Sequence, residues 1–110
     1  MADDQEKKES LKNPEIEVRV EPNWEHKSGL NDGEMWDYVD KVTEGVERDV
    51  RRAVDEADGQ GVGTQIGAAS DAVDEASQQI DSDKIERIHV EIDDDDGRHV
   101  EIEKELVERN

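Results

Sequence analysis

The apolar residues of this chain are sparse, and their spacing changes along the sequence in a way that limits the possible folds. They make up 31% of the 110 positions, and phenylalanine is absent. They alternate with polar residues near the N-terminus, recur every three or four positions through the middle, and alternate again near the C-terminus. Alternation indicates a half-buried strand, and the wider spacing indicates an amphipathic helix. The pattern therefore predicts strands at both ends of the chain with helices between them.

The N-terminal residues divide into a polar arm and a first strand. Residues 1–13 are polar and have no period, so we expect a flexible arm followed by a single domain over residues 14–110. After Pro14, apolar residues alternate with charged ones, which predicts a strand with one buried face. The apolar members of this strand are Ile16, Val18 and Val20.

A loop at residues 22–33 connects the strand to the first helix. Trp24 and Leu30 are expected to attach this loop to the core. Asn31 and Asp32 then mark a helix start, because their side chains can accept hydrogen bonds from the N–H groups of a first helical turn.

The first helix has one apolar stripe and should end near Asp58. Trp36 and Val54 flank the stripe, and the opposite face carries acid-before-base pairs four residues apart, the favoured order. The stripe consists of Met35, Val39, Val42, Val46, Val50, Ala53 and Ala57. The pairs are Asp37–Lys41, Glu44–Arg48 and Glu47–Arg51.

Glycines interrupt this helix before a second one begins. Left-handed glycine can end one helix and let another start, which leaves open whether the helices form a hairpin or one bent rod. The second helix is narrow and rich in alanine and glycine, and its apolar residues follow the alternating spacing of a coiled-coil seam. The glycines are Gly59, Gly61 and Gly63. The seam consists of Val62, Ile66, Ala69, Val73, Ala76 and Ile80.

The last third of the chain predicts a β-hairpin. Opposite residues of an antiparallel pair lie on the same side of the sheet, so apolar residues should face apolar residues. A two-residue turn at Asp96–Gly97 would place Ile92 opposite Glu101 and fails this test. A three-residue loop, Asp95–Gly97, with glycine in the left-handed position satisfies it. The predicted pairs are Ile92 with Val100, Val90 with Ile102, Asp94 with Arg98, His89 with Glu103, and Glu91 with Glu101.

Three strands with a single apolar face need a cover, and the two helices supply it. The expected architecture is a two-layer α+β domain with the element order β-α-α-β-β. The strand order within the sheet stays open.

The charge of the chain constrains its surroundings. Thirty-three acidic residues stand against fourteen basic ones, a formal net charge of −19. Such self-repulsion opposes a compact state in dilute buffer, whereas molar salt shortens the Debye length to about 3 Å. The composition resembles that of proteins from salt-in halophilic archaea and their viruses. We therefore expect a high-salt cytoplasm or a virion, with K⁺ or Na⁺ held nonspecifically at the acidic surface.

Composition also narrows the possible partners. Net negative charge disfavours binding to nucleic acid and to anionic lipid. The absence of cysteine excludes disulfides and thiol catalysis. No apolar run approaches the roughly 20 residues that span a bilayer. We expect no membrane association.

The polar motifs do not predict catalysis or a resident cofactor. The aspartates at residues 93–96 do not match an EF-hand, because Gly97 at the sixth position would place Ile92 at the first. His26, His89 and His99 are not predicted to converge as zinc ligands. The glycines at residues 59–63 lack the strand and lysine of a phosphate-binding loop. We expect no catalytic, cofactor or metal residues.

Two groups of residues are candidates for contacts with other molecules. Arg48, Arg51 and Arg52 form the one basic cluster and could contact an anion or an acidic partner, although salt bridges within the helix would also account for them. The candidate interface comprises the second helix's seam and two aromatic residues, which are anchors of many interfaces when exposed. The candidate interface residues are Trp36, Tyr38, Val62, Ile66, Ala69, Val73 and Ala76.

The first functional hypothesis is a non-catalytic interaction or assembly subunit of a halophilic archaeon or its virus, for example a small virion or connector-type protein. It would act through homo-oligomerisation or with other protein subunits, since a chain with few large apolar side chains buries a thin core. The alternative is a small acidic regulator, either a DNA-binding protein adapted to salt or a mimic of DNA.

Overall fold

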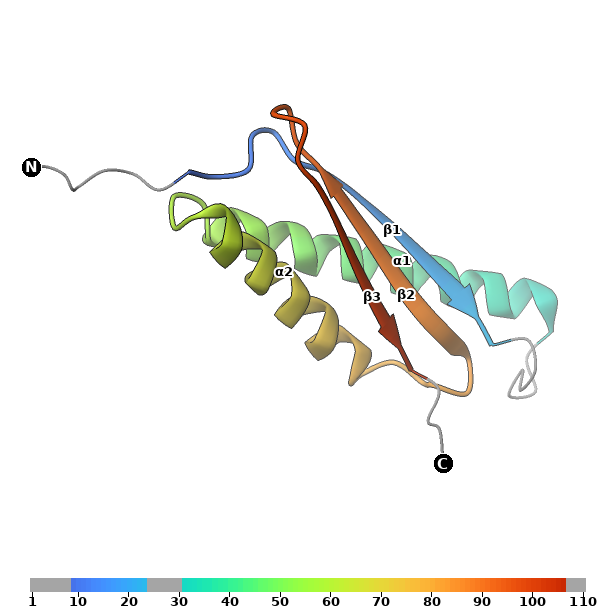
Figure 1. The fold of residues 1–110 in the computed structure, drawn as a ribbon. Coiled ribbons are helices and arrows are strands. Elements are labelled where there is room, and N and C mark those ends of the chain that lie inside the picture. The colour runs from blue at the N-terminus through green and yellow to red at the C-terminus, as the bar shows by residue number, and fades with distance from the viewer. Residues whose placement is uncertain (1–8, 24–30, 107–110) are drawn as a thin grey trace, which may run out of the picture.

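The computed structural model describes residues 9–23 and 31–106, which form a helical layer on one face of an antiparallel sheet (Figure 1). The expected α+β class and the order β-α-α-β-β are confirmed. The elements in chain order are β1 (Glu15–Pro22), α1 (Asp32–Glu56), α2 (Val62–Ser77), β2 (Ile85–Asp93) and β3 (His99–Glu105).

The strand order is β1-β2-β3, so the first strand in the sequence lies beside the strand that follows the helices. Both neighbouring pairs are antiparallel, and Val90 of the central strand faces Val18 on one side and Ile102 on the other. Apolar residues of all three strands therefore share the face that the helices cover.

The predicted hairpin register is confirmed at every pair. Ile92 faces Val100, and Glu91 faces Glu101. The Asp94 N–H donates to the Arg98 carbonyl at 3.1 Å and closes the loop. Gly97 has a φ of 87°, the left-handed conformation that this loop length requires.

The start of α1 is a capping box. The Asn31 side chain accepts from the Glu34 N–H at 2.8 Å, and the Glu34 carboxylate accepts from the Asn31 N–H at 3.1 Å. These two bonds satisfy donors that a helix start leaves without an intrahelical partner.

The buried face of α1 differs from the predicted stripe at its C-terminal end. Val54, expected at the flank, is fully buried, whereas Ala53, expected in the stripe, is half-buried on the outer side. An α-helix has 3.6 residues per turn, so residues spaced four apart (Val46, Val50, Val54) shift gradually around the helix axis. The larger side chain takes the core position, and the alanine is left beside α2.

The two helices form a hairpin, which settles the alternative that the sequence leaves open. α1 ends at Glu56, close to the expected Asp58, and α2 turns back alongside it (Figure 1). Gly59 and Gly61, with φ of 86° and 108°, make the reversal. Neither helix, over the residues described, combines the length and apolar character needed to cross a bilayer.

The core between the layers is aliphatic. Its most buried members come from both helices and from β2, and burying each large aliphatic side chain stabilises the fold by about 1.5–3 kcal/mol. They are Val46, Val50, Val54, Ala69, Val73, Ile85, Ile88, Val90 and Ile92.

Part of the expected flexible arm packs onto the domain. Residues 1–8 lie outside the described part of the chain, as do Trp24 and Leu30. Within residues 9–13, Leu11 is only 5% exposed and belongs to the core cluster. A lone apolar residue has no period, so the sequence pattern could not mark it. The packed chain therefore extends back to Glu9 and does not begin at residue 14.

Candidate functional site

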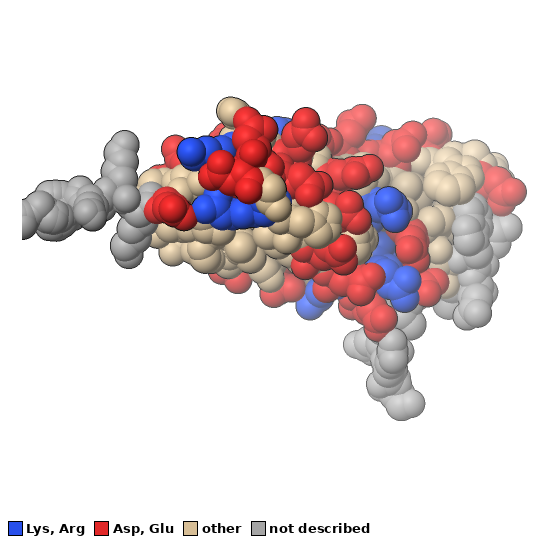
Figure 2. Space-filling model, turned by 45° about the horizontal axis from the view of Figure 1, so that its top comes forward, with Lys and Arg blue, Asp and Glu red and all other residues tan. Residues whose placement is uncertain are grey.

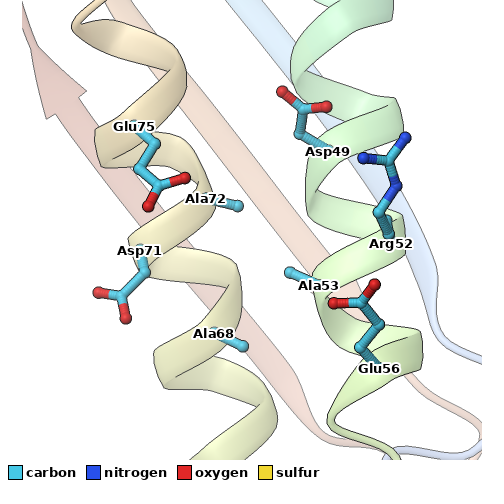
Figure 3. Close-up of a pocket in the computed structure, with 8 residues that line it drawn as sticks. All are labelled: Asp49, Arg52, Ala53, Glu56, Ala68, Asp71, Ala72 and Glu75. Carbon is cyan, nitrogen blue, oxygen red and sulfur yellow. The ribbon is translucent and has the colours of Figure 1, made fainter.

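A groove runs between α1 and α2 on the side of the helical layer away from the strands (Figure 3). Ala53 of α1 points toward Ala68 and Ala72 of α2 across its floor. These side chains end at Cβ, so they leave a hollow of about 390 Å³. Charged residues line the rest of the groove: Asp49, Arg52, Glu56, Asp71 and Glu75.

A second hollow continues along the same pair of helices. It shares Asp49 with the first and includes Gly45 and Ala76, with a volume of about 160 Å³. Together these residues make a shallow trough with a small-residue floor and a charged rim. We call this trough the helical groove.

The seam of α2 serves mainly the chain's own core. Ala69 and Val73 are fully buried, so neither is available to a partner. Val62, Ile66 and Ala76 are half-buried. Periodicity alone cannot say whether a seam faces its own domain or another chain. The alanines that line the groove, Ala68 and Ala72, each lie one position before a buried seam residue.

The two candidate interface aromatics have different surroundings. The Trp36 side chain is 50% exposed and is the exposed large apolar residue of the described chain. Tyr38 is half-buried and links α1 to the loop after α2: its hydroxyl accepts from the Asp81 N–H at 3.1 Å, and the Lys84 ammonium lies 5.0 Å from its ring centre. Tyr38 is therefore a structural contact within the domain.

The predicted arginine cluster lies on the exposed side of α1. Arg51 Nη2 lies 3.0 Å from a Glu47 carboxylate oxygen, the predicted pair. Arg48 Nε instead lies 3.7 Å from the adjacent Asp49. Arg52 is the one cation among the residues lining the larger hollow. Much of the cluster's charge is thus paired on its own helix.

The outer face of the sheet is polar and acidic, in keeping with the acidic side chains that cover much of the surface visible in Figure 2. Glu17, Glu91 and Glu101 lie side by side across the three strands. His89 Nε2 lies 3.1 Å from a Glu91 oxygen, and His99 Nε2 lies 3.0 Å from a Glu101 oxygen. Each imidazole thus contacts a glutamate two residues further along its own strand.

His99 is the most strongly perturbed of these groups. Hydrogen bonds to the Asp93 carboxylate, at 2.6 Å from Nδ1, and to Glu101 raise the pKa of His99 to about 9. Donor atoms of Glu91, His99 and Glu101 lie within 4.8 Å of one another. The predicted register already places Glu91 opposite Glu101, but the convergence with His99 also depends on side-chain rotamers, which the sequence pattern does not give. His26 lies outside the described residues.

Asp94 of the hairpin loop is not available as a calcium ligand, because both of its carboxylate oxygens already accept hydrogen bonds. Asp94 is the buried member of the aspartate run, and it accepts from the N–H groups of Lys12, Asp96 and Arg98 and from the Arg98 guanidinium at 2.8–3.2 Å. Burial alone would raise the pKa of Asp94, but the hydrogen bonds from Arg98 and Lys12 outweigh it and lower the pKa.

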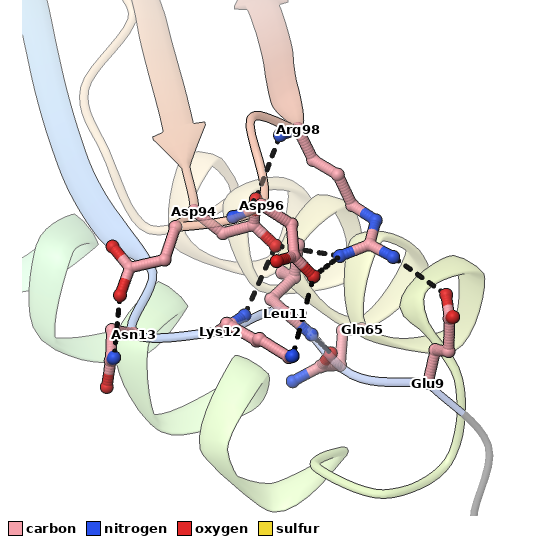
Figure 4. Close-up of polar contacts among 9 residues, drawn as sticks. Glu9, Leu11, Lys12, Asn13, Gln65, Asp94, Asp96 and Arg98 are labelled. Atoms are coloured by element: carbon pink, nitrogen blue, oxygen red, sulfur yellow. Dashed lines mark hydrogen bonds and ion pairs between the residues drawn. The ribbon is translucent and has the colours of Figure 1, made fainter.

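The N-terminal segment is fastened at this same end of the domain (Figure 4). Arg98 also reaches Glu9 at 2.7 Å, and the Asp95 N–H donates to the Lys12 carbonyl at 2.9 Å. The Leu11 N–H donates to the buried Gln65 side chain at 2.7 Å. We call residues 9–13 the N-terminal clasp. It joins the hairpin loop to the helices.

Comparisons with known proteins give no relative. No family model matches the chain, and no curated protein and no solved structure matches it.

Proposed function

We propose that the chain is a non-catalytic assembly subunit that associates with a second copy of itself through the helical groove. The observation that carries this proposal is the groove: a hollow floored by Ala53, Ala68 and Ala72 and rimmed by charges of both signs. Small side chains let another helix approach closely, and close approach increases the packing contacts of an interface.

Both helices are acidic overall, but the arginines of α1 offer partners for the acidic residues of α2. α2 contains no lysine or arginine, and its acidic residues are Asp71, Asp74 and Glu75. α1 carries Arg48, Arg51 and Arg52 within adjacent turns. In a two-fold interface, both protomers use the same surface patch, and the two patches run in opposite directions. The α1 of each protomer can therefore face the α2 of the other. This pairing would bring the arginines of one copy toward the acidic residues of the other.

The net charge sets the conditions for association. Two copies that each carry a formal charge of −19 repel one another in dilute buffer. Molar salt screens this long-range repulsion but leaves apolar contacts intact. The proposed setting is the salt-rich cytoplasm of a halophilic archaeon or a particle of its virus, where the chain would serve as a small structural or connector-type component.

The experiment is light scattering on the full chain across potassium chloride from about 0.1 to 3 M, the range over which the Debye length falls from about 10 Å to below 3 Å. We expect a dimer at high salt. Arg52→Glu should weaken it, Glu75→Arg should weaken it, and the double variant should recover part of the loss. Arg19→Glu is the matched control, because it makes the same charge reversal on β1, away from the groove.

Because salt also weakens the charge pairs, a steric variant complements the reversal series. Ala72→Gln places a longer side chain in the groove and should raise the dimer's dissociation constant while circular dichroism stays unchanged. A dimer that is insensitive to Ala72→Gln and to both reversals would remove the groove from the interface.

The alternative is an acidic regulator, and it is favoured by the uncovered carboxylate face of the sheet. A folded monomer at every salt concentration would shift the proposal to this class. A gel shift at molar potassium chloride would then test direct DNA binding, and competition with DNA for a basic DNA-binding protein would test mimicry.

A further inference from the structure

The outer face of the sheet contains a row of carboxylates that form no ion pair with a lysine or arginine of the described residues. Glu17 faces Glu91, and Glu91 faces Glu101. Like charges directly opposite one another destabilise a sheet. Two rows further along the same face, Arg87 lies 3.0 Å from Glu21 and 3.5 Å from Glu105 and offsets part of their charge.

Within the described residues, no lysine or arginine forms an ion pair with Glu91 or Glu101, whose partners are the imidazoles of His89 and His99. The row therefore combines carboxylate oxygens with imidazole nitrogens, which are the ligand atoms that a transition-metal cation binds.

His99 is held in the orientation that a metal ligand needs. The Asp93 carboxylate can only accept a hydrogen bond, so the His99 Nδ1 must carry the proton across the 2.6 Å contact. Nε2 points toward Glu101, 3.0 Å away, and donates its own proton to that carboxylate, so a bound metal ion would take the place of the Nε2 proton. A carboxylate that fixes the far nitrogen of an imidazole in this way is the usual outer partner of a histidine that binds zinc.

Glu91 is held in a similar way. The His89 Nε2 lies 3.1 Å from one Glu91 oxygen, which leaves the other oxygen of that carboxylate for a second partner. Glu91 is also the least exposed of the converging carboxylates, with 27% of its side chain accessible against 59% for Glu101. Two of the three converging side chains thus have outer contacts that restrict their rotation.

We propose that His99 Nε2, Glu91 and Glu101 form a binding site for a divalent transition metal such as Zn²⁺. Their ligand atoms lie within 4.8 Å of one another, so small adjustments can place each of them 2.0–2.2 Å from one shared zinc ion. One imidazole with two carboxylates favours zinc over the hard cations Mg²⁺ and Ca²⁺, which prefer oxygen ligands alone. Three protein ligands leave a coordination position for water or another molecule. This site does not depend on the helical groove.

The test is calorimetric titration of zinc nitrate into the full chain, in potassium nitrate at a concentration that keeps the protein folded. We expect one Zn²⁺ per chain, with Mg²⁺ binding weakly. His99→Gln should weaken zinc binding by about tenfold or more, and Asp93→Asn should weaken it by a similar order through the loss of orientation. Proton NMR of the imidazoles should show the His99 ring signals shifting with added zinc.

A matched pair of variants distinguishes zinc binding at a defined site from nonspecific attraction of cations to the acidic surface. Glu101→Gln and Glu15→Gln remove the same charge from the same face, but Glu15 lies outside the converging group. Glu101→Gln should weaken binding, and Glu15→Gln should leave it nearly unchanged. Equal losses in the two variants, or binding that does not saturate, would overturn the proposal. These side chains are exposed, and circular dichroism confirms that each variant keeps its fold. Should His99→Gln not fold, Asp93→Asn carries the same comparison.

Discussion

The buried amide of Gln65 should be a main support of the N-terminal clasp. Its side chain is 2% exposed, accepts from the Leu11 N–H at 2.7 Å and donates to the Val54 carbonyl at 3.0 Å. That carbonyl belongs to the last turn of α1, where helical carbonyls lack intrahelical partners. One side chain therefore satisfies two buried backbone groups from distant parts of the chain.

Gln65→Leu keeps much of the volume and removes both hydrogen bonds. Each buried group left without a partner costs about 1–3 kcal/mol. The Leu11 N–H can regain water if the clasp detaches, but detachment forfeits the burial of Leu11, worth about 1.5–3 kcal/mol. Allowing for the apolar burial that leucine adds, we expect a loss of about 2–4 kcal/mol in the free energy of unfolding.

The measurement is urea denaturation in molar potassium chloride, followed by far-ultraviolet circular dichroism. Gln60→Leu is a matched control, since the Gln60 amide also donates to a carbonyl near the end of α1, Glu56 at 3.4 Å, but is exposed. It should cost less than about 0.5 kcal/mol. A Gln65→Leu variant as stable as Gln60→Leu would refute the reasoning. Adding Leu11→Ala to Gln65→Leu should cost less than the sum of the single changes, because the two residues share one contact.

Two further predictions concern solution conditions. Lowering potassium chloride to about 0.1 M lengthens the Debye length to about 10 Å, and we expect tertiary packing to be lost, as measured by thermal denaturation; a cooperative folded unit in dilute buffer would contradict the halophilic interpretation. The lowered pKa of Asp94 means that its stabilising effect is fully present above its unfolded pKa of about 3.9 and is lost as pH falls through the lower folded value. The difference in unfolding free energy between the wild type and Asp94→Asn should therefore shrink below about pH 4, and a difference that is constant with pH would argue against this role.

The strand pairing was predictable because it depends on simple constraints. A side chain alternates faces along a strand, so requiring apolar residues to face apolar residues left one register for the hairpin, and Gly97 suited the resulting loop. The start of α1 was equally clear from Asn31. These features depend on residues close together in the sequence.

The candidate sites were harder to predict because they depend on residues that meet only after folding. The seam of α2 had the right period, but period does not distinguish a domain's own core from an interface, and Ala69 and Val73 proved to be core residues. Leu11 gave no pattern at all. The convergence of Glu91, His99 and Glu101 depends on side-chain rotamers that the predicted register does not fix, and the groove depends on the drift that turned Ala53 outward.

The position of β1 beside β2 has a consequence for the folding pathway. The β2–β3 hairpin closes a three-residue loop, whereas Ile16 can pair with Ile92 only after the chain between them has been brought together. Closing a long loop costs more entropy, and topologies with such distant contacts fold slowly. We therefore expect the C-terminal hairpin and the helix pair to form early, with the docking of the N-terminal strand as the slow step. Until that step, the edge of the central strand is exposed to pairing with other chains.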